Sequence, residues 1–217
     1  MRITYYLDVV SSWCCWAEPA WAELKREFGA SVQFDWKVAL MDAAALPVSE
    51  AQELWFYRRS GTLMRSPRLL NSRWFEAGLK EYLAPNAVSE AARQMGIHDD
   101  CARLAIADAA MRDGVKVGRW QEAVDVAAKE CSLNAAELMR RARSPEVEAA
   151  VRASTAEFHA FKMTVRPAFL LENSIGDRAM FSGIAVAAPI ASTLRAMLSD
   201  AAGYASYAAH HGEPPAG

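Results

Sequence analysis

The sequence predicts an α/β fold in which a β-α-β unit and a β-β-α unit are separated by a large all-helical insertion. Two observations carry this prediction. Strand patterns occur only near the two ends of the 217-residue chain, within residues 5–40 and 166–182. Between about residues 48 and 162 no strand-like run stands out, and Ala, Arg, Glu and Leu recur at helical spacing.

The first unit is a strand, a helix and a second strand. Residues 5–10 are rich in aromatic and β-branched side chains, which is typical of a buried strand, and Ser11 or Ser12 can cap the helix that follows. Pro19 lies inside this helix and should kink it, because proline lacks the amide hydrogen that the preceding turn requires. Residues 31–40 alternate between apolar and polar side chains, the pattern of a half-buried strand. We expect the two strands to be parallel and joined by a right-handed helical crossover.

Helices fill the middle of the chain and close it. Helical patterns occupy residues 86–94, 99–112, 118–129 and 133–143, with Pro145 in the first turn of a further helix. Strands are expected again at residues 166–171 and 178–182, followed by a final helix at residues 189–197. The tail, residues 210–217, has nothing to pack against and is expected to be disordered.

This order of elements is that of a thioredoxin-like fold with a large all-helical insertion. Residues 1–47 and 163–209 are expected to form one discontinuous thioredoxin-like domain, and residues 48–162 to form the insertion. In such a fold, the end of the first strand and the segment before residue 168 meet, although they are far apart in the sequence.

The charge balance argues against several classes of partner. The chain has 24 Lys and Arg against 26 Asp and Glu, a net charge of −2, so no basic field exists to hold nucleic acid or an anionic membrane. No apolar run approaches the roughly 18 residues of a membrane span, and the N-terminus does not look like a signal peptide. We therefore expect a soluble protein of the reducing cytoplasm, with no nucleic-acid or membrane partner.

The cysteine pattern indicates neither a disulfide scaffold nor a metal site. Four cysteines are too few for a disulfide scaffold in a chain of this length. No Cys/His spacing suggests zinc, so no metal is expected. Cys101 and Cys131 fall in the helical block and are expected to be core residues, and Cys15 is expected to pack.

Two short segments are candidates for chemistry. Residues 11–14, Ser-Ser-Trp-Cys, lie where the first strand gives way to the first helix. The free amides and the positive end of a helix stabilise a thiolate or another anion at that place. Residues 165–167, Val-Arg-Pro, directly precede a strand, where a cis-proline and its neighbouring backbone could pair with an extended thiol substrate.

Residues 6–16, Tyr-Leu-Asp-Val-Val-Ser-Ser-Trp-Cys-Cys-Trp, resemble the start of cytoplasmic DsbA-like proteins. This family includes FrnE-type oxidoreductases, 2-hydroxychromene-2-carboxylate isomerases and kappa-class glutathione transferases. The resemblance covers about residues 1–200 and implies that Ser11 replaces the first redox cysteine or corresponds to the serine that holds the sulfur of glutathione. It implies that Cys14 corresponds to the second cysteine, Pro167 to the cis-proline, and Asn71 to part of a polar motif of the isomerases.

The sequence also departs from the family pattern. Ser11 removes the Cys-x-x-Cys pair, so an ordinary dithiol–disulfide cycle is not available at this position. Residues 184–186, Ile-Ala-Val, stand where the glutathione-dependent members carry an acidic pair that grips the γ-glutamyl end. The features of the subfamilies are therefore mixed.

Each candidate residue has both a functional and a purely structural interpretation. Ser11 is either a thiol-contacting residue or a plain helix cap, and Cys14 is either reactive or structural. Ser12, Trp13, Arg166 and Pro167 are candidates for cofactor binding. If Pro167 is cis, we expect Arg166 to point toward the Ser11 end of the first helix, where its charge would stabilise a thiolate or bound anion. Residues 55–74 form a basic segment that contains five arginines and no acidic residue, and this segment is either a site for a substrate carboxylate or a solvated face. Its candidate substrate-binding residues are Arg58, Arg59, Arg65, Arg68 and Asn71.

These residues favour a thiol-dependent isomerase or transferase acting on a small aromatic or carboxylated molecule, with glutathione as the thiol. Two alternatives remain: a monothiol thiol–disulfide oxidoreductase using Cys14, and a redox-inactive thioredoxin-fold binding module. The expected partners are a small thiol and a small organic substrate. The family resemblance also suggests a homodimer.

Overall fold

A four-stranded mixed sheet forms the centre of the computed structural model, which describes residues 1–212. Its strands are β1 (Arg2–Leu7), β2 (Gln33–Val38), β3 (Ala168–Glu172) and β4 (Arg178–Ser182), in the order β2-β1-β3-β4. β1 pairs in parallel with β2 and antiparallel with β3, and β3 pairs antiparallel with β4. The predicted parallel pair and thioredoxin-like fold are confirmed.

Both faces of β1 are buried. Ile3, Tyr5 and Leu7 belong to the main core cluster, where the Tyr5 ring stacks on Phe169 at 4.8 Å between centroids. Tyr6 belongs to a second cluster on the other face, together with Phe158 of α7 (Pro145–Ala160). This double burial explains why the sequence of β1 lacks a regular alternation of polar and apolar residues.

The first strand ends earlier than predicted. β1 stops at Leu7, and residues 8–10 form a turn, in which the Ser11 amide donates to the Asp8 carbonyl at 3.1 Å. Val9 and Val10 are buried although they lie outside the strand, so their apolar character does not distinguish a buried turn from a strand. α1 (Ser12–Phe28) begins directly after this turn and runs on through Pro19.

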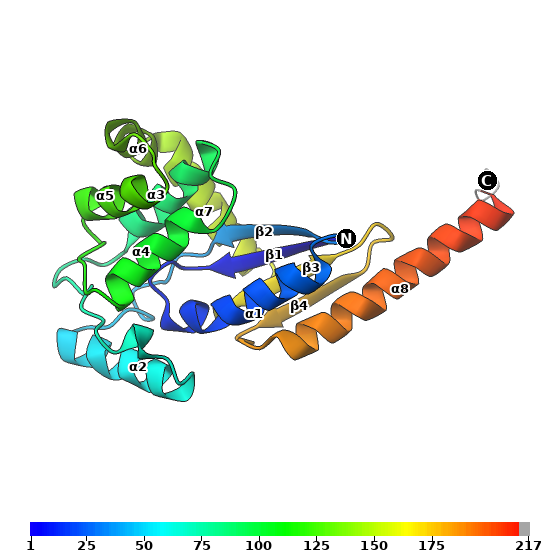
Figure 1. The fold of residues 1–217 in the computed structure, drawn as a ribbon, viewed down its shortest axis with the longest axis horizontal. Coiled ribbons are helices and arrows are strands. Elements are labelled where there is room, and N and C mark those ends of the chain that lie inside the picture. Colours follow the sequence, from blue (N-terminus) through cyan, green and yellow to red (C-terminus); the bar gives the residue numbers. More distant parts are fainter. Residues whose placement is uncertain (213–217) are drawn as a thin grey trace.

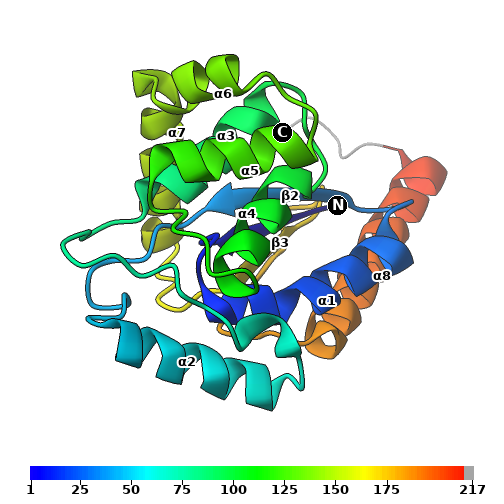
Figure 2. The ribbon, with the colours of Figure 1, turned by 60° about the vertical axis from the view of Figure 1, so that its left-hand side comes forward.

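The helical insertion contains α2 (Glu50–Leu63), the short 3-10 helix η1 (Pro67–Leu69), α3 (Leu83–Gln94), α4 (Cys101–Met111), α5 (Trp120–Glu130), α6 (Ala135–Ala142) and α7. Figure 1 shows that α3 to α7 gather at one end of the sheet, whereas α2 lies apart from them, beside the first turns of α1. Figure 2 shows the same separation from another side. The helices predicted in this region are confirmed, including the start at Pro145 after the Ser144 cap.

The final helix is much longer than predicted. α8 extends from Ala187 to His211, and its second half runs beyond the sheet (Figure 1). The prediction that His210 and His211 belong to a disordered tail is therefore wrong; residues 213–217 lie outside the described part of the chain. The helix continues because the sequence after residue 198 is rich in alanine, the strongest helix former, and contains no proline before residue 214.

A disulfide joins Cys101 and Cys131, with 6.2 Å between their Cα atoms. The expectation that both are core residues is wrong, because each is only half-buried. The pairing has no local signature, since the two cysteines are 30 residues apart and meet only when α4 packs against α5.

Residues 1–212 contain no cluster of three or more His, Cys, Asp or Glu side chains arranged to hold a metal ion. Within the same part of the chain, none of the helices combines the length and apolar character that a membrane crossing requires. The long α8 carries acidic, basic and hydroxyl side chains along its length.

We expect Glu53→Ala to destabilise the insertion. The buried Glu53 carboxylate accepts hydrogen bonds from the amides of Trp74 and Phe75, at 2.9 and 3.0 Å, and from the Ser72 hydroxyl. Its removal leaves these donors buried and unpaired, so the free energy of unfolding should fall by about 3 kcal/mol in urea titrations. Glu50→Ala, an exposed position on the same helix, is the matched control and should change it by less than about 0.5 kcal/mol. Equal effects of the two substitutions would contradict this role of Glu53.

Candidate functional site

A cavity of about 370 Å³ lies at the N-terminus of α1. Its floor is formed by the first residues of α1, its opposite wall by α2, and its rim by the loop that follows β2. The lining residues are Ser11, Ser12, Trp13, Met41, residues 43–48, Gln52, Phe56, Tyr57 and Arg59.

The floor of this pocket is held in place by hydrogen bonds to α2. Ser11 caps α1, and its Oγ accepts a hydrogen bond from the Cys14 amide at 3.4 Å. The Ser60 hydroxyl of α2 donates to the Ser12 hydroxyl at 3.1 Å, and the Tyr57 hydroxyl donates to the Val10 carbonyl. Two bonds from α2 therefore fix the turn and the helix start that carry the serines.

The electrostatics of the floor favour an anion. The first turn of α1 contains no acidic residue, and the amides of Ser12 and Trp13 have no acceptor within the helix. The Ser11 oxygen accepts from the Cys14 amide, and the hydroxyl can donate either to the Cys14 sulfur, where it opposes the rise in pKa, or to a molecule in the pocket. Ser11 is 5% exposed and Ser12 is 6% exposed, so water competes only weakly for the hydrogen bonds of these two residues.

The two cysteines of α1 are buried thiols. Cys14 is 3% exposed, and burial raises its pKa to about 11, although the Ser11 hydroxyl opposes this rise. Burial likewise raises the pKa of Cys15 to about 12. Neither sulfur lines the pocket, and both are protonated at neutral pH.

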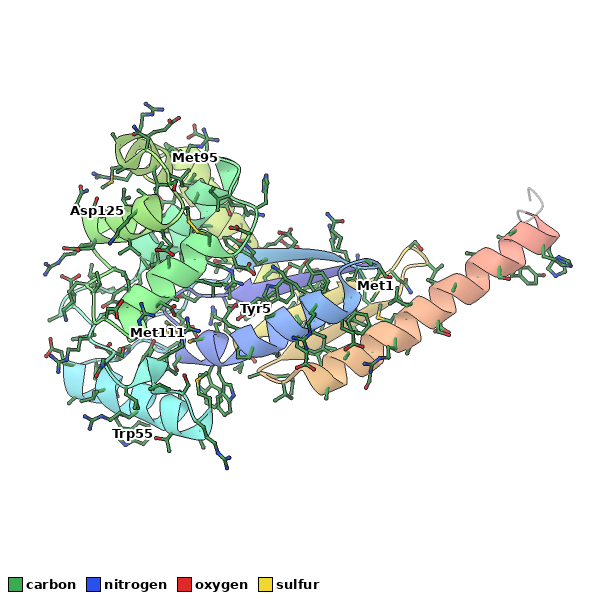
Figure 3. The ribbon with its side chains drawn as sticks, viewed as in Figure 1. Met1, Tyr5, Trp55, Met95, Met111 and Asp125 are labelled. Atoms are coloured by element: carbon green, nitrogen blue, oxygen red, sulfur yellow. A yellow bond between two sulfur atoms is a disulfide. The ribbon has the colours of Figure 1, made fainter. Side chains whose placement is uncertain are left out.

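Arg59 brings a positive charge to the opposite wall. Its guanidinium lies within 5.5 Å of the ring centroids of Trp13, Trp55 and Phe56. The Nε atom is buried without a hydrogen-bond partner, and among residues 1–212 no carboxylate forms an ion pair with this side chain. Figure 3 shows Trp55 on the outer side of α2, whereas Arg59, Trp13 and Phe56 line the pocket.

Arg166 has a different place from the one predicted. The expectation was that its charge faces the Ser11 end of α1. Instead its side chain is buried, its guanidinium donates to the carbonyls of Ala39 and Leu40, and it lies 4.8 Å from the centroid of Phe158. The Arg166–Pro167 peptide bond is cis. Neither residue lines the pocket, and the guanidinium acts on it only by holding the start of the loop at residues 41–48.

Comparison with known proteins identifies the family of this chain. The sequence of residues 2–194 matches the family described as DSBA-like thioredoxin domain. The chain belongs to this family. No curated protein matches the sequence.

Solved structures of DSBA-like and related proteins share the fold. A putative protein disulfide isomerase from Nitrosomonas europaea has a TM-score of 0.71 at 16% identity, with 97% of this chain and 98% of the other covered. The cytosolic disulfide reductase DsbM from Pseudomonas aeruginosa has a TM-score of 0.70 at 17% identity, with 92% and 99% covered. A 2-hydroxychromene-2-carboxylate isomerase has a TM-score of 0.58 at 13% identity, with 99% and 100% covered. At these identities the likeness establishes the fold alone.

The remaining predicted residues of this DSBA-like chain lie outside the pocket. Arg58, Arg65 and Asn71 are exposed, and Arg68 forms an ion pair with Asp108 of α4. Of the basic segment, the structure brings only Arg59 to the site, because a helix turns successive side chains to different faces. The structure therefore brings together Ser11, Ser12, Trp13 and Arg59.

Sequence reasoning missed the rim and part of the α2 wall. The rim loop, residues 43–48, reads Ala-Ala-Ala-Leu-Pro-Val and carries no chemical signature. Ser60 could have been found only as a small polar residue one helical turn after Phe56, on a face otherwise expected to pack.

We expect both α1 thiols to resist alkylation in the folded protein. With its pKa at about 11, Cys14 has on the order of 0.1% thiolate at pH 8, and burial also denies access to the reagent. Iodoacetamide labelling followed by peptide mass spectrometry should therefore be slow at pH 8 and rapid in 6 M urea. Fast labelling of Cys14 near pH 7 would show instead that this thiol is accessible and activated.

Proposed function

We propose that this protein is a thiol-dependent enzyme, an isomerase or transferase, that holds the sulfur of glutathione at the N-terminus of α1 and acts on a small aromatic or carboxylated substrate. The observation that carries the proposal is the polar floor of the pocket. Ser11, Ser12 and Trp13, which carry the first hydroxyls and amides of the helix start, line it, while the neighbouring cysteines are buried and protonated.

The floor suits a thiolate. The Ser11 hydroxyl can donate to the sulfur, and the amides of Ser12 and Trp13 together with the helix dipole stabilise its negative charge. This lowers the pKa of a bound thiol and favours the nucleophilic form. In this proposal Ser11 orients and activates the cofactor sulfur and does not itself react.

The rest of the glutathione molecule is held less completely. The chain before Pro167 can pair with the cysteinyl backbone of the tripeptide, as the family resemblance implies. The γ-glutamyl end has no charged partner at residues 184–186, and α8 begins after Val186 without a side-chain cap. The thiol end therefore fits the site and the γ-glutamyl end fits poorly, so we expect weak binding. The disulfide reductase DsbM of the same fold has been solved with GSH.

The opposite wall suits the second substrate. Arg59 can bind a carboxylate by two parallel hydrogen bonds, and Trp13 and Phe56 offer ring faces to a planar apolar group. The volume of about 370 Å³ is that of a small-molecule site. Reversible addition of the thiolate to such a substrate would lead to isomerisation, and displacement of a leaving group would lead to conjugation.

The two alternatives receive less support. A monothiol oxidoreductase requires an accessible Cys14 with a lowered pKa, whereas burial raises the pKa of this thiol and the residue does not line the pocket. A binding module without chemistry is compatible with the pocket, and it predicts affinity without turnover.

Calorimetric titration of reduced glutathione tests the role of Ser11. We expect Ser11→Ala to weaken binding about tenfold or more, because the variant loses a hydrogen bond to a charged sulfur. Ser11→Thr keeps both the hydroxyl and the helix cap, so it should retain most of the affinity and controls for the loss of the cap. No binding to the wild type, or equal binding by Ser11→Ala, would exclude this thiol site.

Paired arginine variants test the substrate wall. In an assay with 2-hydroxychromene-2-carboxylate and glutathione, we expect Arg59→Met to raise KM about tenfold or more through loss of a carboxylate contact. Glutathione affinity should stay within about twofold, since this residue lies on the other wall. Arg58→Met, the exposed neighbour, is the matched control and should match the wild type. Turnover by the wild type with equal KM in both variants would remove Arg59 from substrate binding.

A further inference from the structure

The disulfide between Cys101 and Cys131 lies away from the pocket and is used by no step proposed above. Cys101 is the first residue of α4, and Cys131 is the residue that ends α5. Both residues are half-buried, in contrast to the buried free thiols of α1. The bond closes a loop of 30 residues and fixes the start of α4 to the end of α5.

The first turn of α4 also carries ion pairs that hold the insertion against α1. Asp100, directly before Cys101, accepts from Lys25 of α1 at 2.6 Å and from Arg103 at 3.1 Å. Arg103 is 3% exposed and donates to Glu18 of α1 at 2.6 Å. Burial alone would raise the pKa of Asp100, but Arg103 and Lys25 hold it below its usual value. These charges are stable only while they stay paired, because a separated buried charge is costly.

The other end of α4 contacts the segment that follows α2. Asp108 forms an ion pair with Arg68 of η1 (Pro67–Leu69). α4 therefore connects α1, whose first residues form the floor of the pocket, with η1, which follows the α2 wall in the chain.

We propose that the Cys101–Cys131 disulfide is reversibly reduced by low-molecular-weight thiols, and that its reduction weakens the contact between α4 and α1. A first thiolate attacks one sulfur of the disulfide, forms a mixed disulfide with that cysteine and releases the other cysteine as a thiolate. A second thiolate then attacks the mixed disulfide at the sulfur of the first thiol. It releases the remaining cysteine and leaves as the oxidised small-molecule disulfide. The protein gains two electrons, the two thiols lose them, and protons from solvent complete the two cysteine thiols.

The consequence for α1 follows from the position of the bond. Without the crosslink, the first turn of α4 has only its own helix hydrogen bonds and the ion pairs to hold it. The chain ahead of it, residues 95–100, is not in a helix. Fraying of this turn moves Asp100 and Arg103, and with them the partners of Lys25 and Glu18. The packing of α4 against α5 remains, so the insertion stays folded while its contact with α1 weakens.

The experiment uses the wild-type protein in glutathione buffers with a graded ratio of reduced to oxidised glutathione. After acid quenching, unfolding and alkylation, mass spectrometry counts the free thiols and locates them by peptide. We expect a reversible transition from two to four free thiols, with the two new ones at Cys101 and Cys131. The oxidised protein should also melt roughly 5–10 °C above the reduced one.

Hydrogen–deuterium exchange of the two forms tests the coupling to α1. We expect peptides from the second half of α1 to exchange several-fold faster in the reduced protein, whereas peptides from α7, which packs against α3, α6 and β2, stay unchanged. The double variant Cys101→Ser, Cys131→Ser should exchange like the reduced wild type and should not respond to the buffer.

Three results would overturn the proposal. The disulfide could fail to form at any ratio, or resist every ratio, and either result would show that it is not a reversible site. The third is a change in exchange confined to residues 101–131, which would show that α1 does not depend on the bond. The thiol count does not depend on glutathione bound at Ser11, and the double variant can be compared with the oxidised wild type in the absence of glutathione, so a failure here is distinguishable from a failure of the proposed enzymatic function.

Discussion

The structure depends on one buried carboxylate, that of Asp8. Its two oxygens accept hydrogen bonds from the Val10 amide at 3.0 Å and from the Met41 amide at 2.9 Å. The first bond shapes the turn that ends β1 and presents Ser11, and the second holds the start of the loop that forms the rim of the pocket. Burial raises the pKa of this carboxyl group, and the two amides oppose the rise. A single side chain thus sets the relative position of the floor and the rim.

The site illustrates how a DSBA-like fold can keep its electrostatics while the reactive group changes. The helix start stabilises a negative charge whatever atom carries it, since the amides and the dipole belong to the backbone. With serine in place of the first cysteine, the chemistry proposed above takes its sulfur from a bound molecule. The pocket beside Ser11 provides room for such a molecule, and the buried Cys14 serves the packing of α1.

Much of the fold could be predicted from the sequence, because local patterns decide it. The period of two in β2, the serine cap of α1, the proline at the start of α7 and the helical spacing of the insertion all correspond to elements of the structure. What failed depends on long-range packing. Arg166 was expected at the site, but its guanidinium donates to the carbonyls of Ala39 and Leu40, just after β2. No residue near Arg166 in the sequence indicates this contact. The choice of Arg59 over Arg58, and the pairing of Cys101 with Cys131, likewise require the three-dimensional arrangement.

The projecting half of α8 has a practical consequence for handling the protein. The helix is 25 residues long and therefore spans about 37 Å, and only its first half packs against the rest. Figure 1 shows that its far end and the helix α2 lie at opposite ends of the molecule. A label or surface attached at the C-terminal end of α8 would stand well clear of the pocket. The protein can therefore be immobilised by this end with its pocket facing the solution.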